Sequence, residues 1–361
     1  MARLSRFAFS FLCAAILIAA MPAAHAQALS PDAADYPPYA APPYPQSRNN
    51  DDGAATPDKS QQNFQIWLQG VQQDAIAAGI ASRAALDALK GVELDDQVID
   101  LDQSQPEHTI TFDQYGRRIV GADRVATGRA FYRQDAKLLA NIGWKFGVPP
   151  SIIVALWGIE SNYGRDPGHF DTLDALATLA YRGQRPGFFR KELIDALRMI
   201  DRDRVPPGDL QGSWAGAMGQ CQFMPSTYLR YAVDDDGNGF SDIWHNQADI
   251  FASIGHYLAA EGWKPGTIWG REVELTRKIS ARDVGLGQTH TLGIWNKLGV
   301  RKLNGKKLPE PLLQASLIQP DGAGGRSFLV YDNFRALMKW NRSTYFATAV
   351  GLLADRIAES R

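Results

Sequence analysis

The chain has 361 residues, of which 45% are hydrophobic, and its formal net charge at pH 7 is −1. So small a net charge argues against strong electrostatic capture of nucleic acid or of an anionic membrane surface. Of the two cysteines, Cys13 lies in the predicted leader described next, so Cys221 has no intrachain partner for a disulfide.

Residues 1–26 have the pattern of a cleavable signal peptide. Two arginines precede the short apolar segment Phe7–Ala20, and Ala24–Ala26 forms an A-x-A cleavage site. The apolar segment is too short for the alternative, an uncleaved membrane anchor. We therefore expect cleavage after Ala26 and export to the periplasm. No later apolar run is long enough to span a bilayer, so no transmembrane segment is expected in the mature chain.

Residues 27–61 are rich in proline, alanine and aspartate, with tyrosines set among the prolines. Such a segment buries too little apolar surface to offset the entropy cost of ordering it. We expect a disordered tether that acts as a spacer. A binding motif built on the tyrosines is the less favoured interpretation.

Helical patterns dominate from Asn63 to about Tyr257. Apolar residues repeat at helical spacing, and prolines, glycines and capping residues mark the ends. The predicted helices are one containing Phe64, Trp67, Leu68 and Val71, then Arg83–Lys90 with Ser82 as N-cap, Val125–Phe146, a helix that begins at Pro149-Pro150 and carries Glu160, Leu173–Arg182, Phe188–Arg202, Pro225–Ala232 and Ala248–Glu261.

The pattern changes from about Trp269. Three segments alternate in strand fashion between turns rich in glycine, proline and lysine: Glu272–Leu275, Leu312–Gln319 and Ser327–Tyr331. We expect a small β-containing insertion at about residues 266–331, after which the helical segment Phe334–Arg356 returns to the main body. The predicted fold class is mainly α (α+β), with a helical body formed by residues 62–265 and 332–357.

The first candidate functional residue is Glu160, which follows the apolar run Ile152–Trp157. On a helix, Leu156 and Trp157 lie one turn before Glu160 on the same face. A carboxyl group in apolar surroundings is desolvated, so its pKa should rise, as a general acid requires near neutral pH. A structural ion pair, for example with Arg165, is the alternative that these residues leave open.

A second motif occupies residues 212–228, where small residues are followed by polar ones. Its glycines let the backbone approach a ligand closely, and Ser213, Gln220 and Gln222 offer uncharged donors and acceptors. Such groups beside aromatic side chains suit a sugar, which presents hydroxyl and acetamide groups. The alternative is a glycine-rich turn before a helix with Ser226 as N-cap, and the two interpretations are compatible.

A third motif is an acidic loop that contains glycines. Asp234, Asp236 and Asn238 stand at positions 1, 3 and 5 of an EF-hand-like loop, and the carbonyl of Phe240 at position 7. Position 12 breaks this pattern because it is His245 in place of glutamate. The loop is either a calcium site or a metal-free turn.

The segments Gly158–Gly164, Ser213–Tyr228 and Asn341–Ala347 occur in an order and spacing that resembles the lytic murein transglycosylase B family. This family belongs to the lysozyme-like enzymes that cleave peptidoglycan. The resemblance extends roughly from Phe64 to Ile357, and its middle motif is long and specific. It implies a lysozyme-like helical catalytic domain with extra helices.

The resemblance also implies a mechanism with one catalytic carboxylate, whereas most glycosidases use two. Glu160 would protonate the glycosidic oxygen between N-acetylmuramic acid and N-acetylglucosamine, while the acetamide of the substrate stabilises the positive centre. The ionised Glu160 would then take the proton of the muramyl C6 hydroxyl, which closes a 1,6-anhydro ring without consuming water. No second catalytic carboxylate is identified in the sequence.

Further site residues are implied by the same resemblance, position by position. Ser213 and Asn341 match polar residues near the muramyl sugar, and Gln222 matches a glutamine beside the catalytic acid. Tyr228 and Tyr345 match aromatic positions around the cleft. Cys221 stands where a small residue such as glycine is expected.

Members of the family can carry an elongated calcium loop closed by a later aspartate, which here is Asp249. A calcium ion bound with Asp234, Asp236, Asn238 and the Phe240 carbonyl would be structural, and catalysis needs no cofactor. The expected partner is the peptidoglycan glycan strand, with cell-wall synthesis proteins as candidate partners.

Two alternatives remain: a hydrolytic muramidase of the goose-lysozyme type and a non-catalytic peptidoglycan-binding scaffold.

Overall fold

The computed structural model describes residues 59–103 and 110–359. The predicted signal peptide and all but the end of the predicted tether lie outside these residues. The first helix begins at Lys59, so helical structure starts slightly earlier than the tether boundary at residue 61 implies. The described chain is mainly helical with one small antiparallel sheet, which confirms the predicted fold class.

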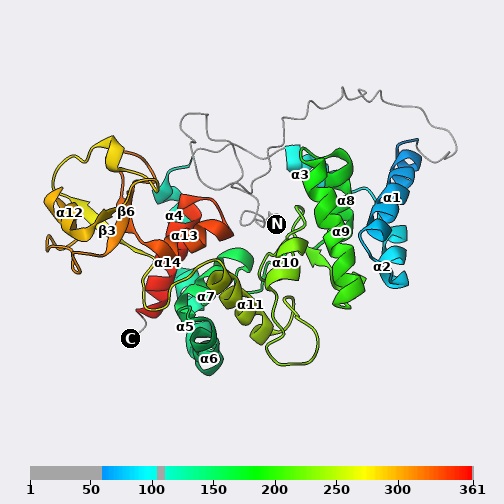
Figure 1. The fold of residues 1–361 in the computed structure, drawn as a ribbon, viewed down its shortest axis with the longest axis horizontal. Helices are drawn as coiled ribbons and strands as arrows, with labels where there is room; N and C mark the ends of the chain where they lie inside the picture. The colour runs from blue at the N-terminus through cyan, green and yellow to red at the C-terminus, as the bar shows by residue number, and fades with distance from the viewer. Residues whose placement is uncertain (1–58, 104–109, 360–361) are drawn as a thin grey trace, which may run out of the picture.

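Thirteen of the helices in the described residues make up the helical body, which occupies the centre and right of Figure 1. These are α1 (Lys59–Ala77), α2 (Arg83–Ala88), α3 (Asp96–Gln103), α4 (Phe112–Ile119), α5 (Ala122–Gln134), α6 (Ala136–Phe146), α7 (Pro150–Ser161), α8 (Thr172–Arg182), α9 (Pro186–Arg202), α10 (Pro225–Tyr231), α11 (Gln247–Ala260), α13 (Asp332–Trp340) and α14 (Thr344–Ala358), with short 3-10 turns at Leu89–Gly91 and Pro207–Asp209.

Helix α7 lies at the centre of this body. Every residue from Ser151 to Ser161 is buried, and α5, α6, α11 and α14 all pack against it. Pro150 begins the helix, where its missing N–H costs no hydrogen bond. Asn162 ends it in the left-handed conformation, with φ of 51°. The site residue Glu160 is therefore held on a rigid, fully packed element.

Two predicted helices are each divided in the structure. The segment Val125–Phe146 forms α5 and α6, because Asp135 leaves the helical conformation with φ of −100° and ψ of 20°. The segment Phe334–Arg356 forms α13 and α14, because Asn341 is extended and the Ser343 hydroxyl caps α14 by accepting from Phe346 N. The apolar spacing continues across both breaks, so periodicity alone could not locate them.

Capping was predicted correctly at one helix and wrongly at another. The Ser82 hydroxyl accepts from Ala85 N at 3.2 Å, as expected for the N-cap of α2. Helix α10 instead has Met224 at its N-cap and Pro225 as its first residue. Ser226 was expected at the cap, but it lies inside the helix, where its hydroxyl donates to Glu192 Oε1 at 2.7 Å.

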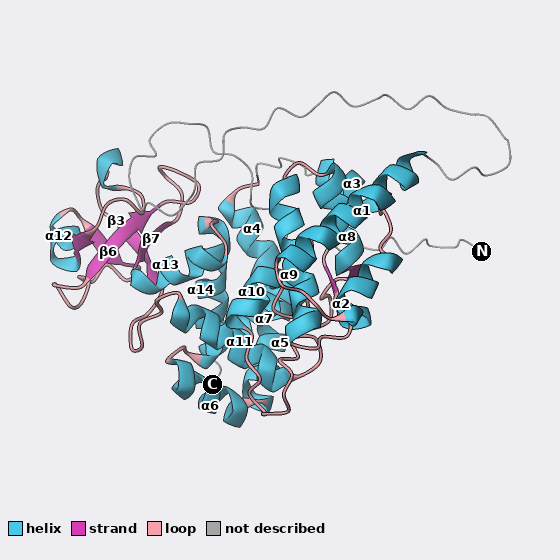
Figure 2. Cartoon of the chain, turned by 45° about the vertical axis from the view of Figure 1, so that its right-hand side comes forward, coloured by secondary structure: helices cyan, strands magenta, loops and turns pink. Residues whose placement is uncertain are grey.

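The strands of the insertion are magenta in Figure 2. They form a five-stranded antiparallel sheet with the order β4-β6-β7-β3-β5. Its elements are β3 (Gly270–Leu275), the 3-10 turn Ala281–Asp283, β4 (His290–Thr291), α12 (Leu292–Lys297), β5 (Val300–Lys302), β6 (Gln314–Ile318) and β7 (Ser327–Val330). The three predicted strands correspond to β3, β6 and β7, while β4, β5 and α12 were not predicted. A separate hydrophobic cluster around Trp295 and Leu317 fills this insertion.

A second, two-stranded pair positions the polar segment beside α7. Strand β1 (Phe170–Asp171) pairs with β2 (Gln211–Gly212), so the loop that follows α7 lies next to the start of residues 212–228. In the part of the chain that the structure describes, no single helix is long and apolar enough to cross a membrane. Helices α6 and α7 pass that test only as a pair, by length and composition, and they are bent by 106° from one another.

Candidate active site

Glu160 lies in the last turn of α7, with 6% of its surface exposed. Burial raises the pKa of its carboxyl group to about 8, and a hydrogen bond from the Trp340 indole acts in the opposite direction. Trp340 Nε1 donates to Glu160 Oε1 at 2.7 Å. Arg165 is exposed, and no cation contributes to this pKa shift, so the ion-pair alternative is not what the structure shows.

Trp340, the partner of Glu160, was not predicted from the sequence. It ends α13, and its ring packs against Tyr257 at 4.7 Å and Phe223 at 5.4 Å between centroids. The Tyr257 hydroxyl donates to the carbonyl of Lys339 at 2.8 Å, which fixes the end of α13. The only signal in the sequence is that Trp340 directly precedes Asn341, a residue that the family resemblance did single out.

The glycines of the second motif are required by the backbone itself. A Cβ atom at Gly212 would lie 2.0 Å from the carbonyl oxygen of Ala217, and one at Gly219 would lie 2.7 Å from that of Ile243. Met218 forms bridges to Gly212 and Phe223, so the segment folds into a tight double turn. These glycines allow close packing of the backbone. Contact with a ligand is then a matter for the polar side chains of the motif.

The two glutamines of the motif differ in role. Gln220 accepts from Trp157 Nε1 at 2.8 Å and donates to the carbonyl of Trp244 at 2.6 Å, so both ends of its amide are used inside the protein. Gln222 has φ of 53° and donates through Nε2 to the carbonyls of Pro167 and Gly219, at 2.7 and 2.9 Å. Its Oε1 accepts no hydrogen bond from the residues that the structure describes and is therefore free to accept one from a ligand.

Ser213 and Asn341 also keep hydrogen-bonding capacity. The Ser213 oxygen accepts from Ala217 N at 3.1 Å, which leaves its hydroxyl hydrogen to donate elsewhere. The Asn341 Oδ1 accepts from Ser343 N at 3.0 Å, which leaves its Nδ2 donors. Asn341 follows Trp340, so its backbone lies next to the residue that contacts Glu160.

The two tyrosines have different surroundings. Tyr228 is 3% exposed, and its hydroxyl donates to the carbonyl of Ser241 at 3.0 Å, so the structure gives it a packing role. Tyr345 is half-buried in the first turn of α14, packs on Phe112 and donates to Asp321 at 2.9 Å. Of the two, Tyr345 alone presents a partly open ring.

Two other buried carboxylates of the helical body, Glu192 and Asp195, each have two partner groups. Glu192 accepts from both the backbone N–H and the hydroxyl of Ser226, at 2.9 and 2.7 Å. Asp195 forms ion pairs with Lys191 and Arg198. Glu160 differs from both, because its carboxyl has a single hydrogen-bond donor among the residues that the structure describes, the Trp340 indole.

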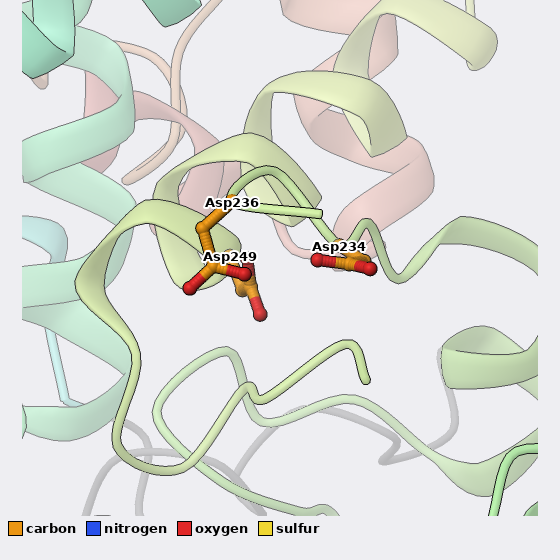
Figure 3. A group of neighbouring side chains, drawn as sticks. All are labelled: Asp234, Asp236 and Asp249. Atoms are coloured by element: carbon orange, nitrogen blue, oxygen red, sulfur yellow. The ribbon is translucent and has the colours of Figure 1, made fainter. Parts of the chain in front are cut away.

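The acidic loop and α11 together form a cluster of three carboxylates. Figure 3 shows the side chains of Asp234, Asp236 and Asp249 as neighbours. Their ligand oxygens lie within 4.8 Å of one another. Asp249 is fully buried, and burial raises the pKa of its carboxyl, although backbone N–H groups of Asp235 and Asp242 donate to it at 2.8 Å.

Hard oxygen ligands grouped in this way fit a calcium ion. Asn238 lies in the same loop and accepts from Phe240 N at 2.9 Å. His245, the residue at the regular twelfth position, is exposed. Asp249, and not His245, joins Asp234 and Asp236 in the carboxylate cluster.

Comparisons with known proteins agree over nearly the whole described chain. A family model described as Transglycosylase SLT domain matches residues 63–355. Membrane-bound lytic murein transglycosylase B of Escherichia coli K12 is 35% identical over 256 residues, which cover 69% of this chain and 68% of the relative.

Solved structures show the same similarity. SltB3 of Pseudomonas aeruginosa, in complex with NAG-NAM-pentapeptide and with NAG-anhNAM-pentapeptide, is 42% identical with a TM-score of 0.79, covering 82% of this chain and 80% of that one. The lytic transglycosylase Slt35 of Escherichia coli, in complex with calcium, is 30% identical with a TM-score of 0.68, covering 82% and 93%.

Proposed function

Because this chain belongs to the lytic murein transglycosylase B family, we propose that Glu160 is the acid and then the base of its reaction. The chain is a lytic transglycosylase that acts on peptidoglycan. The observation that carries the assignment is the buried Glu160 carboxyl, whose pKa is raised to about 8 and whose ionised form has one indole donor. Such a group holds a proton at neutral pH and can still release it.

The proposed reaction proceeds in two proton transfers. Protonated Glu160 gives its proton to the glycosidic oxygen as the bond from the muramyl C1 breaks and the electron pair leaves with that oxygen. The substrate acetamide stabilises the positive charge at C1. Glu160, now ionised, takes the proton of the C6 hydroxyl, and O6 bonds to C1. The products are an N-acetylglucosamine end and a 1,6-anhydromuramyl end, and Glu160 is again protonated.

The surrounding groups support this sequence of steps. The Trp340 N–H stabilises the carboxylate that exists between the two transfers, as a fixed donor at 2.7 Å. Gln222 Oε1, the Ser213 hydroxyl and the Asn341 amide are uncharged groups with hydrogen-bonding capacity left for sugar hydroxyl and acetamide groups. We propose that they bind the sugars on either side of the cleaved bond, with Tyr345 as an aromatic contact and Tyr228 as support.

The masses of the products distinguish this reaction from the hydrolytic muramidase alternative. Digestion of purified sacculi should give muropeptides that end in 1,6-anhydromuramic acid, one water lighter than hydrolysed ends. The relative solved with a NAG-anhNAM-pentapeptide supports this expectation. Mass spectrometry that finds only hydrated, reducing ends would overturn the transglycosylase assignment.

Replacing Trp340 by phenylalanine should change the pH profile in a defined direction. The indole donor lowers the pKa of Glu160, so its loss should move the alkaline limb of the kcat profile, expected near pH 8, to higher pH. Turnover at neutral pH should fall about 10-fold or more, the effect of losing a hydrogen bond to a charged group. The matched control is Trp144→Phe on α6, because that side chain is 89% exposed. An unchanged limb in the Trp340 variant would contradict the role of the indole.

Two further assignments complete the proposal. We propose that the protein works in the periplasm, since a relative is a membrane-bound enzyme of the cell envelope and residues 1–26 have a signal-peptide pattern. Fractionation against a periplasmic marker tests this location.

We also propose that Asp234, Asp236 and Asp249, with Asn238 and the Phe240 carbonyl, hold a structural calcium ion. The carboxylate cluster and the relative crystallised with calcium support this assignment. When bound, the ion would join the acidic loop to the first turn of α11.

A further inference from the structure

A basin of about 380 Å³ opens where the end of α4, the start of α5 and the loop after α7 meet. Arg118, Arg124, Arg165 and Asn162 line it, together with one acidic residue, Asp123. Two residues lie between the end of α4 and the start of α5, and α5 packs against α7. The basin therefore begins two residues beyond the proposed catalytic Glu160.

The charge in this basin is mainly positive. Its lining contains three guanidinium groups and one carboxylate. Within residues 59–103 and 110–359, none of the three arginines forms a salt bridge. Arg124 donates through Nη1 to the carbonyl of Ile119 at 2.9 Å, while its Nε is buried without a hydrogen-bond partner. Guanidinium groups of this kind bind carboxylates in a two-pronged geometry.

The start of α5 adds to the positive potential. Gly121 is its N-cap and has no side chain to accept from the free N–H groups of the first turn. The dipole of this 13-residue helix places partial positive charge at the same end. The guanidinium groups and the helix end thus favour the same kind of ligand, an anion.

The basin also adjoins the catalytic site. Tyr115, one turn before Arg118 on α4, has its ring 5.8 Å from that of Tyr345. The Tyr163 hydroxyl donates to the carbonyl of Arg124 at 2.7 Å, which ties the start of α5 to the loop after α7. Asn162 is two positions after Glu160 in the chain, so their Cα atoms lie no more than about 7.6 Å apart.

We propose that this basin binds a carboxylate of the peptide stem carried by the muramyl sugar at the catalytic site. The inference rests on the proposed function, because it takes peptidoglycan as the substrate. The sugars are met by uncharged groups, whereas a peptide stem ends in a carboxylate and needs a cationic partner. An extended stem of five residues spans about 17 Å, enough to reach from the sugar to the basin.

The test uses two substrates and two matched double variants of the full-length mature protein. The substrates are glycan strands of equal length with their peptide stems intact or removed by an amidase. The test variant is Arg118→Gln/Arg165→Gln, since both side chains are exposed and neither is buried in the core. The control is Arg117→Gln/Arg133→Gln, which removes the same charge from exposed positions on α4 and α5 outside the basin.

The quantity measured is kcat/KM on each substrate. In the test variant, kcat/KM for the peptide-bearing strand should fall about 10- to 100-fold further than for the peptide-free strand, as loss of charge-assisted hydrogen bonds predicts. The control variant should keep the wild-type ratio between the two substrates. Equal losses on both substrates, or no loss on either, would overturn the inference.

A different result of the same experiment would contradict the proposed function. If the wild-type protein cleaves neither strand, the assignment of the reaction is wrong. If it cleaves both strands equally well, the reaction stands and the peptide site is wrong. A second measurement is the rise in melting temperature that inorganic phosphate causes. If the Arg118/Arg165 variant alone loses this rise, and kcat/KM does not differ between the two strands, the basin binds a free anion and the peptide site is wrong.

Discussion

Replacing Glu160 by glutamine should lower the release of muropeptides from sacculi by about 10⁴-fold, the upper range for loss of a general acid and base. The amide has nearly the shape of the carboxyl but cannot give up or take the proton that both steps require. Binding to sacculi should persist, because the groups that face the sugars are unchanged. Product release measured by chromatography, together with co-sedimentation on sacculi, tests both halves of this expectation.

Glu192→Gln is the matched control for this substitution. Glu192 is also a buried glutamate, 2% exposed, but it accepts from Ser226 at the start of α10 and does not contact the Glu160–Trp340 pair. This variant should lose stability and keep most of its turnover per folded molecule. Undiminished turnover in Glu160→Gln would exclude the proposed mechanism. Absence of turnover in the wild type with binding retained would favour the non-catalytic scaffold.

The same Glu160 substitution should make the protein more stable at alkaline pH. The folded pKa of Glu160, about 8, lies above its ordinary value of 4.5, so between these values the unfolded chain releases a proton that the folded chain retains. Wild-type stability that is present below pH 4.5 is therefore lost as pH rises through 8, by up to about 5 kcal/mol. Glutamine has no such dependence. Melting temperatures of the two proteins should diverge from pH 5 to pH 8 in favour of Glu160→Gln.

The central helix was predictable because its signals are local. An unbroken apolar run, two prolines before it and a carboxylate near its end lie within about one dozen residues, and α7 forms over that span. A buried carboxyl with a raised pKa follows from the same residues. The strands β3, β6 and β7 were also found from their own alternation, whereas β4 and β5 have only two or three residues each and carry too little pattern to detect.

The contacts that complete the site could not be predicted because they join distant parts of the chain. Trp340 reaches Glu160 across 180 residues, and Gln220 reaches Trp157 across 63. Gln220 looks like a ligand-binding residue in the sequence, yet its amide links α7 to the 212–228 segment. Composition gives the type of group available at each position, and only the fold decides which partner it meets.

In the acidic loop, too, the sequence indicates the ligand types and the fold decides which residues come together. The spacing of Asp234, Asp236 and Asn238 indicates oxygen ligands, but it cannot say which residue closes the loop. Folding brings Asp249, 15 positions after Asp234, into the cluster from the first turn of α11. The closing residue depends on where α11 begins, and Asn246 sets that point as its N-cap.

Calcium should raise the melting temperature of the wild-type protein. An ion that binds only the folded state at 100 times its dissociation constant adds about 2.7 kcal/mol to the free energy of unfolding. For a domain of this size that corresponds to a shift of roughly 5 °C. The physical reason is that Asp234, Asp236 and Asp249 are held close together and repel one another until a cation lies between them. Thermal unfolding with excess calcium and with excess chelator measures the shift.

Asp249→Asn should abolish this shift, because it removes the buried charge that closes the cluster. The control is Asp235→Asn in the same loop, since Asp235 pairs with Lys145 at 2.7 Å and stands outside the cluster of three carboxylates. That variant should retain the response to calcium. Magnesium should give a smaller shift, because it demands a tighter octahedral shell than a flexible loop of carboxylates and carbonyls provides. Equal responses in Asp249→Asn and the wild type would place the calcium effect elsewhere and contradict the proposed loop site.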